Sequence, residues 1–166
     1  MANTLVFLNE NKLMDYNELV RQTDDSVRKF AEISKNIKSV ETRMTEISEL
    51  QEQIGGYSKT RDIYAQYKAS GWNRNFYESH QSDIIRHKAA KKYFDSLGYG
   101  KDKKLPSINQ LKQEYAVLKS EKGKLYRKYK SERERKQRLV TAKHNTDRIL
   151  HITPEKTEQR TMGFGR

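Results

Sequence analysis

The sequence predicts an all-α protein: an elongated antiparallel helical hairpin, coiled-coil-like, with a small helical head between its two long helices. Only two prolines, Pro106 and Pro154, interrupt the 166 residues, and both lie where a helix is expected to be bounded. Apolar residues recur at intervals of seven in both halves of the chain. Apolar and charged residues each make up 34% of the chain, which suits a thin seam between long helices better than a thick core.

The N-terminal part combines a short apolar segment with a helix start. Thr4–Leu8 is predicted to form one or two helical turns that pack onto the main body, and it is too short for a signal sequence or a membrane span. Asp15 with Glu18 three residues later forms a capping-box-like start. We therefore predict a long helix over about residues 16–69, ended by Ser70-Gly71.

This first long helix carries apolar residues on two adjacent lines at heptad spacing. The first line is Phe30, Ile37 and Met44, and the second is Ile33, Val40, Ile47 and Ile54. The pattern is typical of a helix that lies along another helix. Gly55-Gly56 interrupts it, and because each glycine costs a helix roughly 1 kcal/mol relative to alanine, we expect a kink or a short break there.

Bulky apolar residues concentrate in the middle of the chain, where we predict the helical head over about residues 72–104. They are Trp72, Phe76, Tyr77, Ile84, Ile85, Tyr93, Phe94 and Leu97. Asn75 with Glu78 is expected to cap a turn. A helix is expected to begin at Ser82 or Asp83 and to run to Leu97, closed by Gly98.

A second long helix is predicted over about residues 108–151, because Ser107 and Gln110 form a capping box directly after Pro106. Its seam becomes polar over the second half, where Lys122, Glu132, Lys136 and Lys143 occupy heptad positions. The stretch 132–136 either faces solvent or pairs with Glu41, Glu46 or Glu49. Residues 153–166 have the composition of a disordered tail, so residues 1–152 are predicted to form a single helical domain.

Positive charge is concentrated in the second part of the chain. Residues 1–56 carry 7 Lys+Arg and 10 Asp+Glu, whereas residues 57–166 carry 27 and 12. Residues 119–138 hold 10 basic and 3 acidic residues, with Tyr126 and Tyr129 interleaved. We expect the acidic first helix to lie beside this stretch and to neutralise part of its charge. The surplus predicts a polyanionic partner, and nucleic acid (DNA or RNA) is the partner that we expect.

The candidate nucleic-acid-binding residues are basic side chains from three stretches. They are Lys59 and Arg61; Arg86, Lys88, Lys91 and Lys92; and Lys122, Lys124, Arg127, Lys128, Lys130, Arg133, Arg135, Lys136 and Arg138. Around Lys59, one interpretation is a helix with Tyr57, Ile63 and Tyr64 packed inward, and the other is a patch in which Ser58 and Thr60 also donate to phosphates. Around Lys91, Ala89 and Ala90 permit close helix packing, and a structural and a functional interpretation are equally open.

The sequence contains few residues that would indicate an enzyme. His80 and His87 are seven apart, as are His144 and His151, whereas metal-binding pairs on a helix are usually four apart. There is no cysteine, no phosphate-binding loop and no nucleophile elbow. We therefore predict no enzymatic activity, no cofactor, no metal and no membrane insertion, and a cytoplasmic location.

Several segments together carry a resemblance to a known family. They are Thr4–Leu8, Asp15–Leu19, Tyr57–Asp62, His87–Lys92, Leu105-Pro106, Gln113–Ala116 and Thr141–Leu150. In order and spacing, over nearly the whole chain up to Leu150, the sequence resembles the C-terminal helical region of relaxases, the mobilisation nucleases of conjugative elements of Gram-positive bacteria.

The resemblance implies a role in DNA mobilisation without the DNA-nicking reaction. In such relaxases a separate domain nicks DNA with a catalytic tyrosine and a three-histidine metal site, and neither is present here, so no catalytic residue is carried over. The helical region is expected to hold DNA, to oligomerise or to meet protein partners of the transfer machinery. Three hypotheses follow: a nucleic-acid-binding accessory protein of a mobile genetic element, an interaction coiled coil that includes a possible homodimer, and an inhibitor of a host RNA-guided nuclease.

Overall fold

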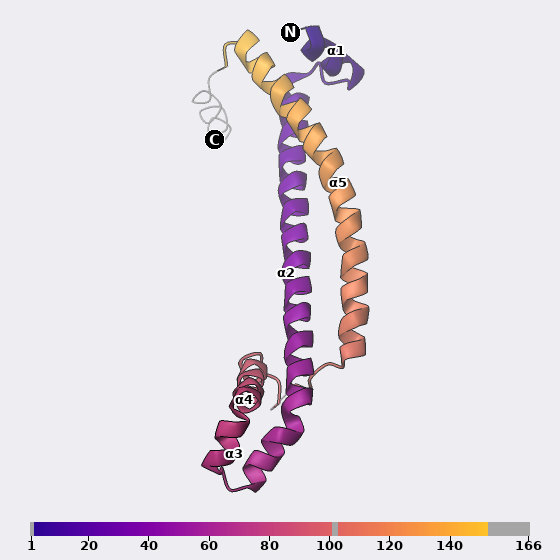
Figure 1. Ribbon diagram of the computed structural model, residues 1–166. Coiled ribbons are helices and arrows are strands. Elements are labelled where there is room, and N and C mark those ends of the chain that lie inside the picture. The colour runs from indigo at the N-terminus through magenta and orange to yellow at the C-terminus, as the bar shows by residue number, and fades with distance from the viewer. Residues whose placement is uncertain (1, 101–102, 153–166) are drawn as a thin grey trace, which may run out of the picture. The chain divides into compact units, whose positions relative to one another are not determined.

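The computed structural model describes residues 2–100 and 103–152, and over these residues the chain is all-α (Figure 1). Its helices are α1 (Ala2–Glu10), α2 (Tyr16–Ala69), α3 (Arg74–Ser79), α4 (Gln81–Ser96) and α5 (Ile108–Ile149). Long α2 and α5 pack antiparallel with the shorter helices between them in sequence, which confirms the predicted fold class. The predicted disordered tail, 153–166, lies outside the described residues, as do residues 101–102 of the predicted head. No helix of the described chain combines the length and apolar content needed to cross a bilayer.

The helices build two compact units, and α2 and α5 contribute a segment to each. The terminal unit consists of residues 2–38 and 123–152, and the central unit consists of residues 39–122 without the two undescribed positions. That residues 1–152 form a single helical domain stays a prediction.

The core of the terminal unit joins α1 to the ends of α2 and α5. Its buried residues are Leu8, Leu13, Leu19, Leu139 and Ala142. Two polar contacts flank this core: the Asn145 side-chain amide donates to Thr4 Oγ1 at 2.8 Å, and the Tyr16 hydroxyl donates to Asp147 Oδ1 at 2.7 Å. The prediction that Thr4–Leu8 is helical and packs onto the body is confirmed, with α1 longer than expected.

The core of the central unit joins α2, α4 and the start of α5. Its buried residues are Ile47, Leu50, Ala90, Phe94, Tyr99 and Leu111. At its edge the Arg43 guanidinium donates from Nε to Glu114 Oε1 at 2.7 Å and from Nη2 to Glu114 Oε2 at 3.2 Å. Two parallel hydrogen bonds of this kind fix geometry as well as charge, so this pair sets the register of α2 against α5 within the unit.

Two helix starts follow their predicted capping residues. The Glu18 backbone N–H donates to Asp15 Oδ1 at 2.8 Å. Ser107 and Gln110 form the predicted reciprocal box, because the Ser107 N–H donates to Gln110 Oε1 and the Gln110 N–H donates to Ser107 Oγ. These side chains satisfy backbone donors that have no partner inside their helix.

Two predicted helix starts in the head are wrong by a short distance. The cap of α3 is Asn73 and not Asn75, since Asn73 Oδ1 accepts from the Phe76 N–H at 3.1 Å. Helix α4 begins at Gln81, ahead of both predicted start residues. Both helices begin earlier than the pattern of capping residues indicates. For α4 the reason is that α3 ends at Ser79, so that only His80 connects the two helices.

Of the kink or short break predicted at Gly55-Gly56, the break does not occur, because α2 is one helix from Tyr16 to Ala69. The ribbon of α2 bends over its final turns (Figure 1). Gly56 is buried beneath Arg86 of α4, and a Cβ added there would lie 2.8 Å from Arg86 Nε, whereas nothing lies within 4 Å of one added at Gly55. The absence of a side chain at Gly56 therefore lets α4 approach α2 closely.

The two glycines should respond differently to alanine. Gly55→Ala is expected to raise the free energy of unfolding by about 1 kcal/mol, because the added methyl meets open space and alanine favours helix. Gly56→Ala should gain clearly less, because Arg86 has to move. Urea denaturation followed by circular dichroism measures both, and equal gains would contradict the close approach at Gly56.

Candidate nucleic-acid interface

The basic stretch of α5 in the terminal unit is defined here as residues 124–138. Heptad spacing directs one side of this stretch toward α2: Leu125 and Tyr129 are half-buried, and Leu139 just beyond it is buried. The Tyr129 ring centroid lies 4.9 Å from that of Phe30 on α2. The side of α5 opposite this seam is left to solvent.

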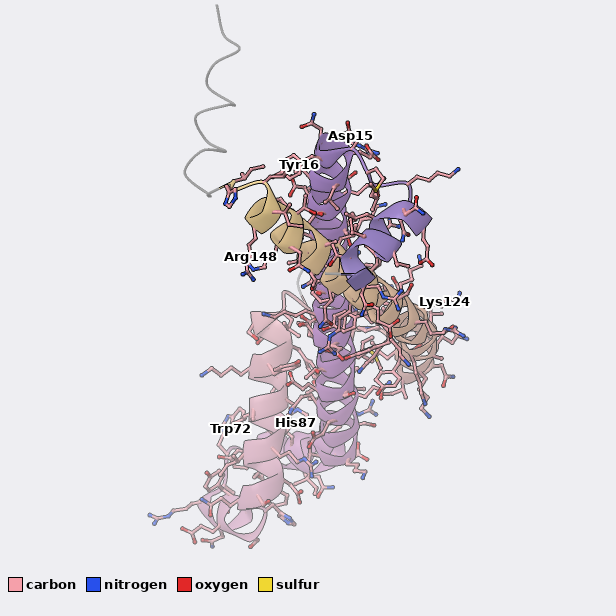
Figure 2. The ribbon with its side chains drawn as sticks, turned by 90° about the horizontal axis from the view of Figure 1, so that it is seen from above. Asp15, Tyr16, Trp72, His87, Lys124 and Arg148 are labelled. Atoms are coloured by element: carbon pink, nitrogen blue, oxygen red, sulfur yellow. The ribbon has the colours of Figure 1, made fainter. Side chains whose placement is uncertain are left out.

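The cations of the basic stretch lie mainly on that solvent side and on its flanks. The exposed ones are Lys124, Arg127, Lys128, Lys130, Arg133, Arg135 and Arg138. Figure 2 shows Lys124 at the outer edge of α5. Positions three or four apart share a helix face, so Lys124, Arg127, Lys130 and Arg138 form a row away from the seam, in which the exposed Glu134 lies four residues from both Lys130 and Arg138. The structure thus places most of the predicted binding residues of α5 on one continuous surface.

Of the cations in the stretch 119–138, which α2 was expected to neutralise in part, Lys122 pairs with Glu41 of α2 at 2.8 Å, and the described cations of residues 124–138 form no ion pair with α2. In the described part of the terminal unit, Glu18 and Asp25 pair with Arg21 of α2 itself, with N–O distances of 2.6 and 3.4 Å. Hydrogen bonds from the Arg21 guanidinium and from Gln22 lower the pKa of Glu18 to about 2. Glu18 and Asp25 are therefore engaged within their own helix.

Cross-helix contacts of the basic stretch go to uncharged groups. Arg135 Nη2 donates to Gln22 Oε1 at 2.7 Å, and Lys136 Nζ lies 3.9 Å from the centroid of the Phe30 ring. An amide oxygen and an aromatic face hold a cation without cancelling its charge. Pairing with glutamates of α2 was one of two alternatives for the stretch 132–136, and it does not occur in the described residues. Glu41 instead binds Lys122 at 2.8 Å, and Glu46 binds Arg43 at 3.0 Å.

Two of the predicted site residues belong to the seam. Lys122 is half-buried in the central unit and paired with Glu41. Lys136 is half-buried against Phe30. Both already have partners, unlike the exposed row on α5, and we place them in the supporting structure.

The patch around Lys59 lies on α2 in the central unit. Lys59 and Arg61 are exposed as predicted, and Arg61 Nε is 3.7 Å from Asp62 Oδ1. Thr60 is not available to a phosphate, because it is buried and its hydroxyl donates to the Gly56 carbonyl at 2.9 Å. The interpretation that includes Thr60 as a phosphate donor is therefore wrong.

The patch around Lys91 lies on α4, with Arg86, Lys88, Lys91 and Lys92 exposed. His87 in the same segment is buried, and its ring stacks between Tyr57 and Tyr64 with both centroid distances at 4.2 Å. Burial lowers the pKa of His87, so the ring is a neutral core element. Within the described residues no three His, Asp or Glu side chains are arranged to hold a metal ion.

Comparison with known proteins gives no independent assignment. The chain matches no protein-family model, no curated protein and no solved structure. The function proposed below therefore rests on the charge, burial and contacts of this chain.

A buried carboxylate inside the seam gives a stability prediction. Glu132 Oε2 is buried and has no hydrogen-bond partner among the described residues. Glu132→Leu should raise the free energy of unfolding by about 1–2 kcal/mol, because it removes an unsatisfied polar atom and extends the apolar line. The control Glu134→Leu removes the same charge from an exposed position and should change stability by less than about 0.5 kcal/mol. Equal effects in urea denaturation would show that burial of Glu132 is not the cause.

Proposed function

We propose that this protein is a non-catalytic nucleic-acid-binding accessory protein that contacts a phosphate backbone through the basic stretch of α5. The resemblance to the helical region of relaxases supports a role for this activity in DNA mobilisation by a mobile genetic element. The observation that carries the proposal is the row Lys124, Arg127, Lys130 and Arg138, which is exposed and forms no ion pair with a described residue. Four exposed cations around the single carboxylate of Glu134 leave a net positive row, which favours a polyanionic ligand.

The dimensions of the stretch fit a nucleic-acid backbone. Fourteen helical steps of 1.5 Å span roughly 21 Å, the length of about six phosphates of one duplex strand. Contacts of this kind position a protein without reading sequence, so binding should show little base preference. Tyr126 lies within the stretch with 45% of its surface exposed, and its ring offers a stacking face for an unpaired base.

The hypothesis of an acidic helix that pairs with a basic helix has less support. Such a coiled coil needs carboxylates of α2 that reach α5, of this chain or of a second copy. Glu41 meets this requirement at Lys122 in the central unit, but in the terminal unit Glu18 and Asp25 form pairs three or four residues apart within α2. We therefore favour a nucleic acid as the ligand of the basic stretch.

A charge-matched pair of triple variants tests the proposal. Lys124→Gln, Arg127→Gln and Lys130→Gln together should weaken binding of single-stranded and duplex oligonucleotides at least about tenfold near 50 mM salt. Fluorescence anisotropy of labelled oligonucleotides across a salt series measures this. The slope of log affinity against log salt should become shallower by up to about 3, because each lost phosphate contact removes roughly 0.9.

The control changes the same charge at exposed lysines of α2 in the same unit. Lys29→Gln, Lys35→Gln and Lys38→Gln should leave affinity within about twofold of the parent chain, with helix content checked by circular dichroism. Equal losses from the two triple variants would show that net charge, and not the basic stretch, governs binding. No binding by the parent chain at low salt would reject the proposed function.

A further inference from the structure

The end of α4 builds a feature that lies apart from the basic stretch of α5. Gly98 has φ +76° and closes the helix, with its N–H donating to the Asp95 carbonyl at 3.1 Å and the Tyr99 N–H donating to the Phe94 carbonyl at 2.9 Å. This pair of bonds is the Schellman ending. It returns the chain toward α4, so Tyr99 is buried in the same cluster as Phe94.

A second glycine, Gly100, brings Tyr99 and Lys103 together. Gly100 has φ +106°, which L side chains rarely adopt, and its N–H donates to the Lys103 carbonyl at 3.0 Å. Tyr99 and Lys103 consequently form an isolated β-bridge. The Lys103 ammonium lies 4.7 Å from the centroid of the Tyr99 ring, a cation–π contact that holds this charge at a defined place.

These turns enclose a cavity of about 540 Å³ in the central unit. Its lining combines two kinds of side chain: the aromatic Tyr57, Phe94 and Tyr99, and the basic Lys91, Lys103 and Lys104. A volume of this order is that of a pocket for a small organic ligand, roughly 300–1,000 Å³. The three lysines are exposed and form no ion pair with a described residue.

The lining defines a ligand with two parts. Three lysines in one lining favour a phosphate, and the apolar rings of the same lining strengthen that attraction because they lower the local dielectric. The aromatic walls favour a flat ring. Asp95 adds one carboxylate to the lining, which is an acceptor for an amino or a hydroxyl group.

We propose that this cavity binds a nucleoside monophosphate, with the phosphate at Lys91, Lys103 and Lys104 and the base against the aromatic walls. The nucleotide is either free or the terminal nucleotide of a strand. The proposal does not depend on the function proposed for α5, because it rests on residues of the central unit alone.

Isothermal titration calorimetry with the full chain tests the chemistry of the ligand. AMP should bind at least about tenfold more tightly than adenosine or inorganic phosphate, because each of these fills only half of the cavity. Equal affinity for phosphate and AMP would reduce the feature to a simple anion site and overturn the proposal. Absence of AMP binding would overturn it as well.

Paired variants test the location. Lys103→Gln with Lys104→Gln should weaken AMP binding about tenfold or more, whereas Lys112→Gln with Lys119→Gln, exposed lysines of α5 in the same unit, should change it less than about twofold. Equal effects would reject the cavity as the site. The triple variant of the basic stretch should bind AMP normally, so failure of either proposal is visible without the other.

Competition identifies the source of the nucleotide. An oligonucleotide with a 5′-phosphate that displaces AMP from the triple variant, where its 5′-hydroxyl counterpart does not, supports a strand end. Displacement by neither oligonucleotide supports a free nucleotide. Displacement by both equally would show that the cavity recognises an internal backbone and would contradict a monophosphate site.

Discussion

Burial of the heptad seam between α2 and α5 is the constraint on which the other features depend. A helix of 42 residues with few apolar side chains has one narrow line to bury. Where that line is apolar, as at Leu111 and Leu139, the residues are buried. Where it is polar, Lys122 finds a carboxylate and Lys136 finds an aromatic face. With the seam fixed in this way, the cations of the basic stretch that lie off the seam face solvent.

The pairing of the acidic residues of α2 determines how much positive charge the basic stretch of α5 keeps. Carboxylates on α2 had two possible partners, the arginines of their own helix or the cations of α5. In the terminal unit, Glu18 and Asp25 both pair with Arg21 of their own helix. Pairs at such exposed positions contribute little to stability, about 1 kcal/mol or less. Their larger effect is that the basic stretch of α5 keeps its charge, and this supports the proposal of a polyanionic ligand.

Much of the fold could be predicted because it is encoded locally. The caps Asp15 and Ser107 and the closing Gly98 act within a few residues, and the heptad lines specify the seam directly. Features that depend on contacts distant in sequence could not be predicted. The side chain of Arg86 from α4 lies against Gly56, and the Thr60 hydroxyl is unavailable to a phosphate because it faces His87. Lys103 and Lys104 appear in the sequence only as part of a glycine-rich loop, and their arrangement around a cavity depends on two left-handed glycines.

The central claim is that the basic stretch of α5 is the surface that meets nucleic acid, and acylation of lysines in the presence and absence of a single-stranded oligonucleotide tests it most directly. Mass spectrometry reports the reactivity of each lysine. The account predicts that the oligonucleotide protects Lys124, Lys128 and Lys130 and that high salt removes this protection. Lys29, Lys35 and Lys38 on α2 should react equally in both conditions. Protection of the α2 lysines with none on α5 would contradict the account.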